Sequence, residues 1–85
     1  MTPLTPGSCY RLWYKGTKKP LLIGITLLDD LCNPTGLIEF GEVFLVIRNR
    51  TDHIDGYDVL ARKLGLITGL GFATDKDNVV FQEIV

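Results

Sequence analysis

Acidic and histidine side chains are the first candidates for chemistry, because carboxylates and imidazoles bind metals and move protons. Asp52, His53 and Asp55 lie close together, and Asp75 with Asp77 forms a second acidic loop. A metal site needs three or four convergent ligands, whereas the chain has one histidine and the second loop lacks the full calcium-binding series. Both segments are typical of turns, which Asp stabilises through local hydrogen bonds. We therefore expect no metal and no cofactor.

Nucleophilic catalysis would require Cys9 or Cys32 beside His53, and their spacing does not indicate that they meet. The glycine-rich run 65–71 has neither the Lys-Ser/Thr pair of a phosphate-binding loop nor the glycine order of a dinucleotide-binding motif. The sequence predicts a non-enzymatic protein, with a small-pocket enzyme at an oligomer interface as an alternative. We expect two reduced thiols, and a single Cys9–Cys32 bridge stays open.

The N-terminal segment combines aromatic side chains with cations, a mixture used where bases stack and phosphates are neutralised. Its members are Tyr10, Arg11, Trp13, Lys15, Lys18 and Lys19. In a strand, alternation places Tyr10 on one face and both Arg11 and Trp13 on the other, so part of the aromatic set belongs to a core. Single-stranded nucleic-acid binding is therefore an alternative function, behind a structural role for these residues.

Length and composition limit the remaining possibilities. The 85 residues, 46% of them hydrophobic, fit one folded domain spanning 1–85. A formal net charge of −1 gives no overall field toward nucleic acid or an anionic membrane. No apolar run reaches the roughly 18–20 residues of a membrane span, and residues 1–7 lack the regions of a signal peptide. We expect a cytoplasmic or virion location without membrane binding.

Glycine and proline interrupt the sequence so often that no helix of ordinary length fits between them. The intervening runs are rich in Val, Ile, Leu, Phe and Tyr, which favour strands. We predict an all-β fold with strands at 8–14, 21–28, 42–50, 57–63, 66–72 and 79–84. The Asp55-Gly56 pair predicts a hairpin, because a tight reversal needs a positive φ.

A strand after Pro6-Gly7, a long irregular connection over 15–41 and then closely spaced strands resemble an SH3-like small β-barrel of five or six strands. The resemblance concerns architecture and includes no functional motif of the family, so it implies a fold without an activity. An OB-like barrel is the nearest rival, and a two-sheet sandwich is the next. Residues 27–31 fit either a strand end or one helical turn.

Apolar residues outnumber the interior positions that a small barrel can provide, so we expect some of them to contact other protein subunits, either copies of this chain or different proteins. The expected interface residues are Leu21, Leu22, Phe44, Val46, Leu70, Val79 and Phe81, with edge pairing along 79–84. The hypothesis is a structural assembly or interaction module; by analogy, small barrels serve as virion decoration or connector proteins and as accessory subunits. Alternatively, segment 15–41 covers the excess apolar surface.

Overall fold

The computed structural model describes residues 3–18, 23–71 and 76–85, and within them the chain is all-β, as predicted. The described residues form seven strands, so the expected count of five or six was wrong. The strands are β1 (Cys9–Tyr14), β2 (Gly24–Leu28), β3 (Pro34–Glu39), β4 (Val43–Arg50), β5 (Gly56–Leu60), β6 (Leu64–Ile67) and β7 (Val79–Ile84). Within the same ranges, no helix has the length and hydrophobicity needed to cross a membrane.

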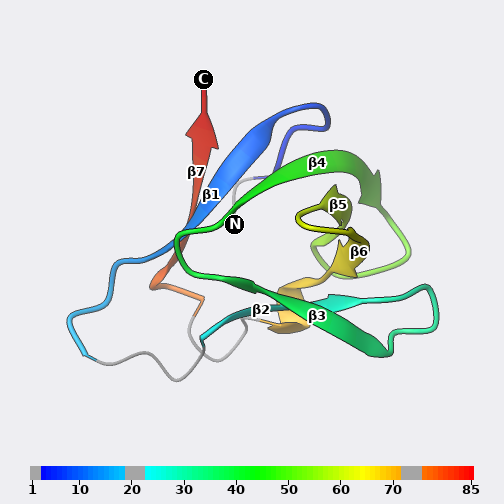
Figure 1. Cartoon of the computed structure of the whole chain (residues 1–85), viewed down its shortest axis with the longest axis horizontal. Helices are drawn as coiled ribbons and strands as arrows, with labels where there is room; N and C mark the ends of the chain where they lie inside the picture. Colours follow the sequence, from blue (N-terminus) through cyan, green and yellow to red (C-terminus); the bar gives the residue numbers. More distant parts are fainter. Residues whose placement is uncertain (1–2, 19–22, 72–75) are drawn as a thin grey trace.

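All seven strands belong to one antiparallel sheet with the order β3-β2-β6-β5-β4-β1-β7. The sheet curls around its own concave face, with β1, β4 and β7 on one side and β2 and β3 on the other (Figure 1). Among the described residues, the edge strands β3 and β7 are not paired with each other, so the sheet is open and the expected barrel is not confirmed. One register pair, Leu28 with Leu66, joins β2 to β6.

The hairpin predicted at the Asp-Gly pair is confirmed by the pairing of β4 with β5. Asp55 adopts a φ of 47°, which supplies the left-handed residue needed to reverse the chain before Gly56. The amide of His53 donates a hydrogen bond to the carbonyl of Arg50, 3.2 Å away, and closes the turn. Asp52, His53 and Asp55, considered from the sequence as metal ligands and interpreted as turn residues, lie in this turn.

The sequence predicted a long irregular connection over 15–41. The structure instead contains strand β3 within that segment. The reversal before it is built on Asp29, whose Oδ1 accepts hydrogen bonds from the amides of Leu31 at 2.9 Å and Asn33 at 2.8 Å. Cys32 has a φ of 63° in the same turn. Pro34 is tolerated as the first residue of an edge strand, where its missing N–H costs no ladder hydrogen bond.

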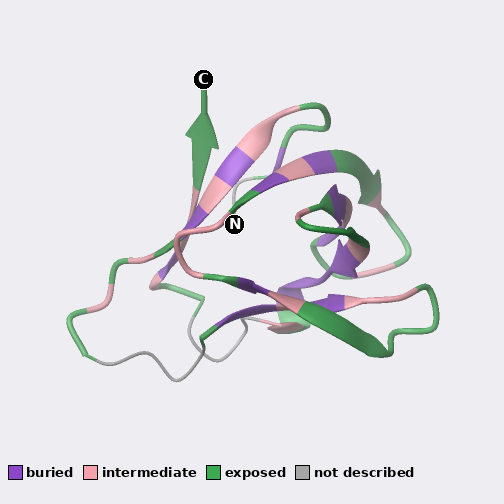
Figure 2. Ribbon diagram, in the orientation of Figure 1, coloured by how far each residue is buried: buried purple, intermediate pink, exposed green. Residues whose placement is uncertain are grey.

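The concave face of the sheet holds one hydrophobic core (Figure 2). The core comprises Leu4, Tyr10, Leu12, Ile25, Leu27, Ile38, Phe44, Val46, Tyr57, Val59, Ile67 and Val79. Two of its phenols fix the N-terminal segment over it. The Tyr57 hydroxyl accepts a hydrogen bond from the amide of Leu4 at 3.0 Å, and the Tyr10 hydroxyl accepts one from the amide of Thr5 at 2.7 Å. Buried phenols are thus satisfied while the rings fill the core.

Three residues expected at an interface lie in this core, which corrects the sequence-based assignment. Phe44 and Val46 are fully buried on β4, and Val79 is buried on β7. The ring of Phe44 packs between Tyr10 and Phe81, with centroid distances of 6.2 and 6.1 Å. A strand with two apolar faces buries only one of them in an open sheet, and on β4 the buried face contains Phe44 and Val46.

Candidate protein-interaction surface

A row of four apolar residues crosses the convex face of the sheet from β5 to β7. Leu60 is paired with Leu45, Leu45 with Cys9, and Cys9 with Ile84. Opposed residues of antiparallel strands place their side chains on the same face, so these four side chains form a continuous ladder. The alternate residues of the same strands fill the core, which places the ladder on the outer side.

Further apolar side chains extend this ladder along the strands. Trp13 on β1 is opposed to Val80 on β7. On β4, Val43 lies two positions before Leu45, and Ile47 lies two positions after it, at the β-bulge. The outer apolar face is defined by Cys9, Trp13, Val43, Leu45, Ile47, Leu60, Val80 and Ile84. Five of these side chains are 40–43% exposed, namely Trp13, Val43, Ile47, Leu60 and Ile84. Contiguous exposed apolar residues of this kind mark interaction surfaces.

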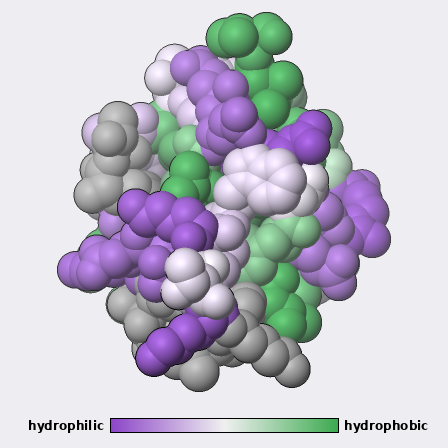
Figure 3. Space-filling model, turned by 90° about the vertical axis from the view of Figure 1, so that its left-hand side faces the viewer, coloured by the Kyte–Doolittle hydropathy of each residue, from purple (hydrophilic) through white to green (hydrophobic). Residues whose placement is uncertain are grey.

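Figure 3 shows the side of the molecule on which β1 and β7 lie. Hydrophobic surface gathers at the top, where β7 ends, and again along one margin, and polar side chains lie between the two areas. From this side the surface is therefore mixed, with separate apolar areas and polar side chains between them.

The polar groups on the outer apolar face have partners within the chain. The indole Nε1 of Trp13 donates a hydrogen bond to Oε1 of Gln82 at 2.6 Å. The guanidinium carbon of Arg11 lies 5.7 Å from the centre of the Trp13 ring, within the range of a cation–π interaction. Gln82 and Arg11 are themselves opposed across β7 and β1. The indole is therefore held in one orientation before any partner binds.

An ionic cluster occupies the other end of the convex face, on the β4–β5 hairpin. Arg50 contacts three carboxylates: both oxygens of Asp52 at 3.0 Å, Asp58 at 3.0 Å and Asp30 at 3.6 Å. The hydrogen bonds from Arg50 lower the pKa of Asp52 from 3.8 to about 2, and those to Asp52 and Asp58 raise the pKa of Arg50. Arg48 also pairs with Asp58. The cluster, with two arginines and three aspartates, borders the apolar face.

The remaining interface predictions fall on different parts of the molecule. Leu70 is exposed and lines an open cleft, on the segment that follows β6. Phe81 packs against the core through Phe44. Leu21 and Leu22 lie outside the described residues. Strand β7 lies at an edge of the sheet, and the pairing of that edge with another chain stays a prediction.

The residues predicted to bind nucleic acid are divided between two faces. Tyr10 is buried in the core, whereas Arg11 and Trp13 lie on the outer face of β1. Lys15 and Lys18 are exposed after the end of that strand, and Lys19 lies outside the described residues. The structure thus brings one cation and one aromatic ring together, and it removes Tyr10 from any base-stacking surface.

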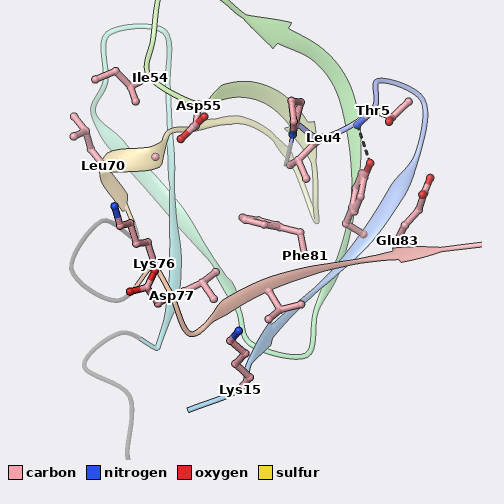
Figure 4. Close-up of a pocket in the computed structure, with 15 residues that line it drawn as sticks. Leu4, Thr5, Lys15, Ile54, Asp55, Leu70, Lys76, Asp77, Phe81 and Glu83 are labelled. Atoms are coloured by element: carbon pink, nitrogen blue, oxygen red, sulfur yellow. Dashed lines mark hydrogen bonds between the residues drawn. The ribbon is translucent and has the colours of Figure 1, made fainter. Parts of the chain in front are cut away.

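The cleft at the open side of the sheet has a volume of about 930 Å³. Phe81 points into it, Leu70 and Lys76 lie on one side, and Glu83 lies on the opposite side (Figure 4). Lys15 and Lys76 share the lining with three acidic residues, Asp55, Asp77 and Glu83, so the cleft has no single sign of charge. Its described lining contains neither cysteine nor histidine, so the cysteine–histidine pair considered from the sequence does not lie in this cleft.

The described part of the chain contains neither a metal-binding group of side chains nor a disulfide. Residues 3–18, 23–71 and 76–85 contain no group of three His, Cys, Asp or Glu side chains positioned to hold a metal ion. Cys9 is half-buried and Cys32 is exposed, and neither is in a disulfide. The convex apolar face is consequently the feature of the described surface with the clearest functional meaning.

Comparison of the chain with protein-family models, curated proteins and solved structures gives no match. The function is therefore argued from the surface itself. Sequence reasoning missed Cys9, Val43, Leu45, Ile47 and Leu60 as surface residues, whereas Val80 and Ile84 belong to the range 79–84 that was expected to pair along an edge. For Val43, Leu45 and Ile47 the signal was present in the double apolar pattern of 43–47, which showed that one face of that strand needed cover without showing which face it was.

Proposed function

We propose that this chain is a non-enzymatic interaction module that docks onto a protein surface through its outer apolar face. The observation that carries the proposal is the ladder Leu60–Leu45–Cys9–Ile84, which continues across four strands. Its members and their neighbours belong to regular strands, so binding would order no loop and would lose little conformational entropy. Trp13, already fixed by Gln82, provides an amphipathic anchor of the kind enriched at binding hot spots.

The curled sheet supports a scaffold role for the module. Seven strands around one core give a rigid platform, and the same curvature suits the small SH3-like barrel class that the sequence resembles. Assembly components such as virion decoration or connector proteins and accessory subunits use platforms of this size, and a cytoplasmic or virion setting belongs to the same proposal. The ionic cluster around Arg50 would lie at the edge of the docked area.

Affinity recovery from the source cells tests this function with a tagged chain in three forms. The wild type is compared with the variant Ile47→Lys/Leu60→Lys, which places two charges on the outer apolar face. Leu31→Lys is the matched control, because Leu31 is also an exposed leucine and lies in the turn between β2 and β3, outside the strands that form the face. We expect the wild type and the control to recover the same proteins, including untagged copies of the chain, and the double variant to lose them. Equal recovery by all three forms would contradict the proposal.

Nucleic-acid binding is the second candidate, and the contact of Arg11 with Trp13 favours it. The exposed Lys15 and Lys18 follow on the same segment and could neutralise phosphates. Trp13 is the chain's single tryptophan, so its fluorescence reports directly on this site. Binding predicts a change in emission on adding a single-stranded oligonucleotide at low salt, and reversal of that change by added salt. An emission spectrum unaffected by the oligonucleotide would exclude this candidate.

A further inference from the structure

A polar row crosses the outer apolar face between two apolar rows. Arg11 on β1 is opposed to Val43 on β4 and to Gln82 on β7. Along antiparallel strands, the next residues on the same face lie two positions away. These neighbours are Leu45, Cys9 and Ile84 on one side, and Trp13 and Val80 on the other. Arg11 and Gln82 are therefore polar side chains flanked by apolar ones.

Trp13 orients the polar groups of this row. Its indole Nε1 can only donate, so the hydrogen bond to Gln82 engages the amide oxygen and leaves the two N–H donors of Nε2 facing away from the indole nitrogen. The guanidinium of Arg11 lies over the same ring, with its carbon 5.7 Å from the ring centre. Arg11 has five N–H donors and no acceptor. The row thus sets two donor groups on directly opposed residues, whose Cβ atoms are typically about 4.5–5.5 Å apart.

Arg11 differs from the other arginines in having no carboxylate beside it. Among the described residues, Arg48, Arg50 and Arg62 each pair with a carboxylate, and Arg11 does not. Arg11 is half-buried among apolar side chains, so it loses part of its hydration without gaining an ion pair within the described chain. A carboxylate from outside would compensate that loss through two parallel N–H···O bonds to the guanidinium. Nε2 of Gln82 is placed to donate to the same anion.

The apolar surroundings of Arg11 select the kind of anion. Nucleic acid carries a phosphate on every nucleotide and is bound by several cations together. The polar row contains one cation, and Lys15, the next cation along the chain, lines the cleft instead of this face. A protein partner fits better, because a single acidic side chain can stand among apolar residues. Trp and Arg, the two residue types in contact here, are enriched at protein-binding hot spots.

We propose that the partner of the outer apolar face is a protein segment with one acidic side chain flanked by apolar ones. Its carboxylate binds Arg11 and Gln82, and its apolar side chains cover Trp13 and the ladder on either side of the polar row. The inference rests on the proposed function and specifies the chemistry of the partner. Because the carboxylate meets a charge that no described residue neutralises, it contributes affinity as well as orientation.

Peptides from a phage-displayed random library serve as probes. They are selected on the wild-type chain, and those that fail to bind Ile47→Lys/Leu60→Lys are kept as ligands of the outer apolar face. Each is synthesised with its carboxylates and in the matching Asn or Gln form, and calorimetry measures both affinities. We expect the selected peptides to carry an Asp or Glu among apolar residues, and the amide forms to bind at least about fivefold more weakly. Ligands of this face without an acidic residue would overturn the inference and leave the proposed function standing, whereas a library that yields no ligand of this face would count against both.

Arg11→Met tests the cation itself, because Met keeps the apolar stem and removes the charge. Arg62→Met is the matched control, since Arg62 already pairs with Glu42. Circular dichroism confirms that both variants fold. On Arg11→Met the acidic peptide and its amide form should bind equally, whereas Arg62→Met should keep the difference between them. A difference that persists on Arg11→Met would assign the carboxylate to another cation and overturn the inference. Arg11-dependent binding of a single-stranded oligonucleotide, with no acidic peptide bound, would make phosphate the anion and overturn it as well.

Discussion

Arg50 Nη1 lies 3.6 Å from Oδ1 of Asp30, which joins the β4–β5 hairpin to the turn between β2 and β3. The two segments are not neighbours in the sheet, because β5 and β6 lie between β4 and β2. The same guanidinium holds Asp52 and Asp58 at 3.0 Å. A side chain only 16% exposed thus links three carboxylates that would otherwise repel one another. It is one of the polar connections across the weakly paired β2–β6 junction, together with the hydrogen bond from Lys63 Nζ to the carbonyl of Thr35.

Replacing Arg50 by Met should lower the melting temperature by several degrees. Met keeps the apolar stem and removes the guanidinium, so the three aspartates lose their shared partner while their mutual repulsion remains. Arg62→Met is the matched control, because Arg62 makes one exposed pair with Glu42 and such pairs contribute little. Thermal unfolding followed by circular dichroism at neutral pH checks both. A larger loss for Arg62→Met than for Arg50→Met would contradict the role given to the cluster.

Acid should destabilise the protein through Asp52. Its pKa is lowered from 3.8 in the unfolded chain to about 2 in the fold, chiefly by the hydrogen bonds from Arg50. The stabilisation from a lowered carboxyl pKa is fully present above the unfolded pKa and is lost as the pH falls through the folded one. The hydrogen bond from the Asn33 amide lowers the pKa of Asp29 in the same direction. Stability should therefore fall between about pH 4 and pH 2.

The variant Asp52→Asn isolates this contribution, since it removes the titrating group. We expect its stability at neutral pH to be lower than that of the wild type and its loss on acidification between about pH 4 and pH 2 to be smaller. Asp77→Asn is the control, because Asp77 lies at the cleft and outside the ionic cluster. Urea unfolding at a series of pH values measures the difference. Parallel pH profiles for Asp52→Asn and the wild type would show that the pair with Arg50 is not formed.

Much of the fold followed from local sequence. The runs of branched and aromatic residues predicted strands, and the Asp55-Gly56 pair predicted the β4–β5 hairpin that the structure contains. Strand β3 was missed because Pro34, Thr35 and Gly36 make it look like a turn. Only the sheet order shows that these residues form an edge, where a proline at the first position is tolerated. Position in the sheet is a non-local property, so propensity alone could not supply it.

The interaction surface was harder to predict than the fold. The run Val43–Ile47 is apolar on both faces, and its pattern shows that one set of residues must be buried without showing which. The choice depends on the register with β1, where Tyr10 and Leu12 share the face of Phe44. Exposed apolar side chains remain on β1, β4, β5, β6 and β7, as the surplus of apolar residues had led us to expect. Their location required the strand pairing.

Gly24→Ala should destabilise the protein by about 2 kcal/mol, a cost typical of overpacking. A Cβ at this position would clash with the carbonyl oxygen of Ile38 and lie 2.8 Å from the Cα of Glu39, so β2 and β3 would have to separate. Gly36→Ala on β3 is the matched control. The nearest neighbour of its Cβ would be the flexible end of Lys63, at 3.0 Å, and Leu27 would lie in ordinary contact at 3.7 Å. Urea unfolding should show the larger loss for Gly24→Ala, and equal losses would rule out the close β2–β3 approach as the cause.

Val43 and Val46 lie on opposite faces of β4, so the same substitution to Ala should lower the free energy of unfolding by different amounts at the two positions. Val46 is 0% exposed in the core, and Val43 is 41% exposed on the outer apolar face. Val46→Ala removes two buried carbon atoms and leaves a cavity, so we expect a loss of about 2–3 kcal/mol in the free energy of unfolding. Val43→Ala should change it by less than about 0.5 kcal/mol. The free energies from urea unfolding decide between the faces. A Val43→Ala variant as unstable as Val46→Ala would mean that the convex face is covered within the monomer, and the proposed docking surface would then be lost.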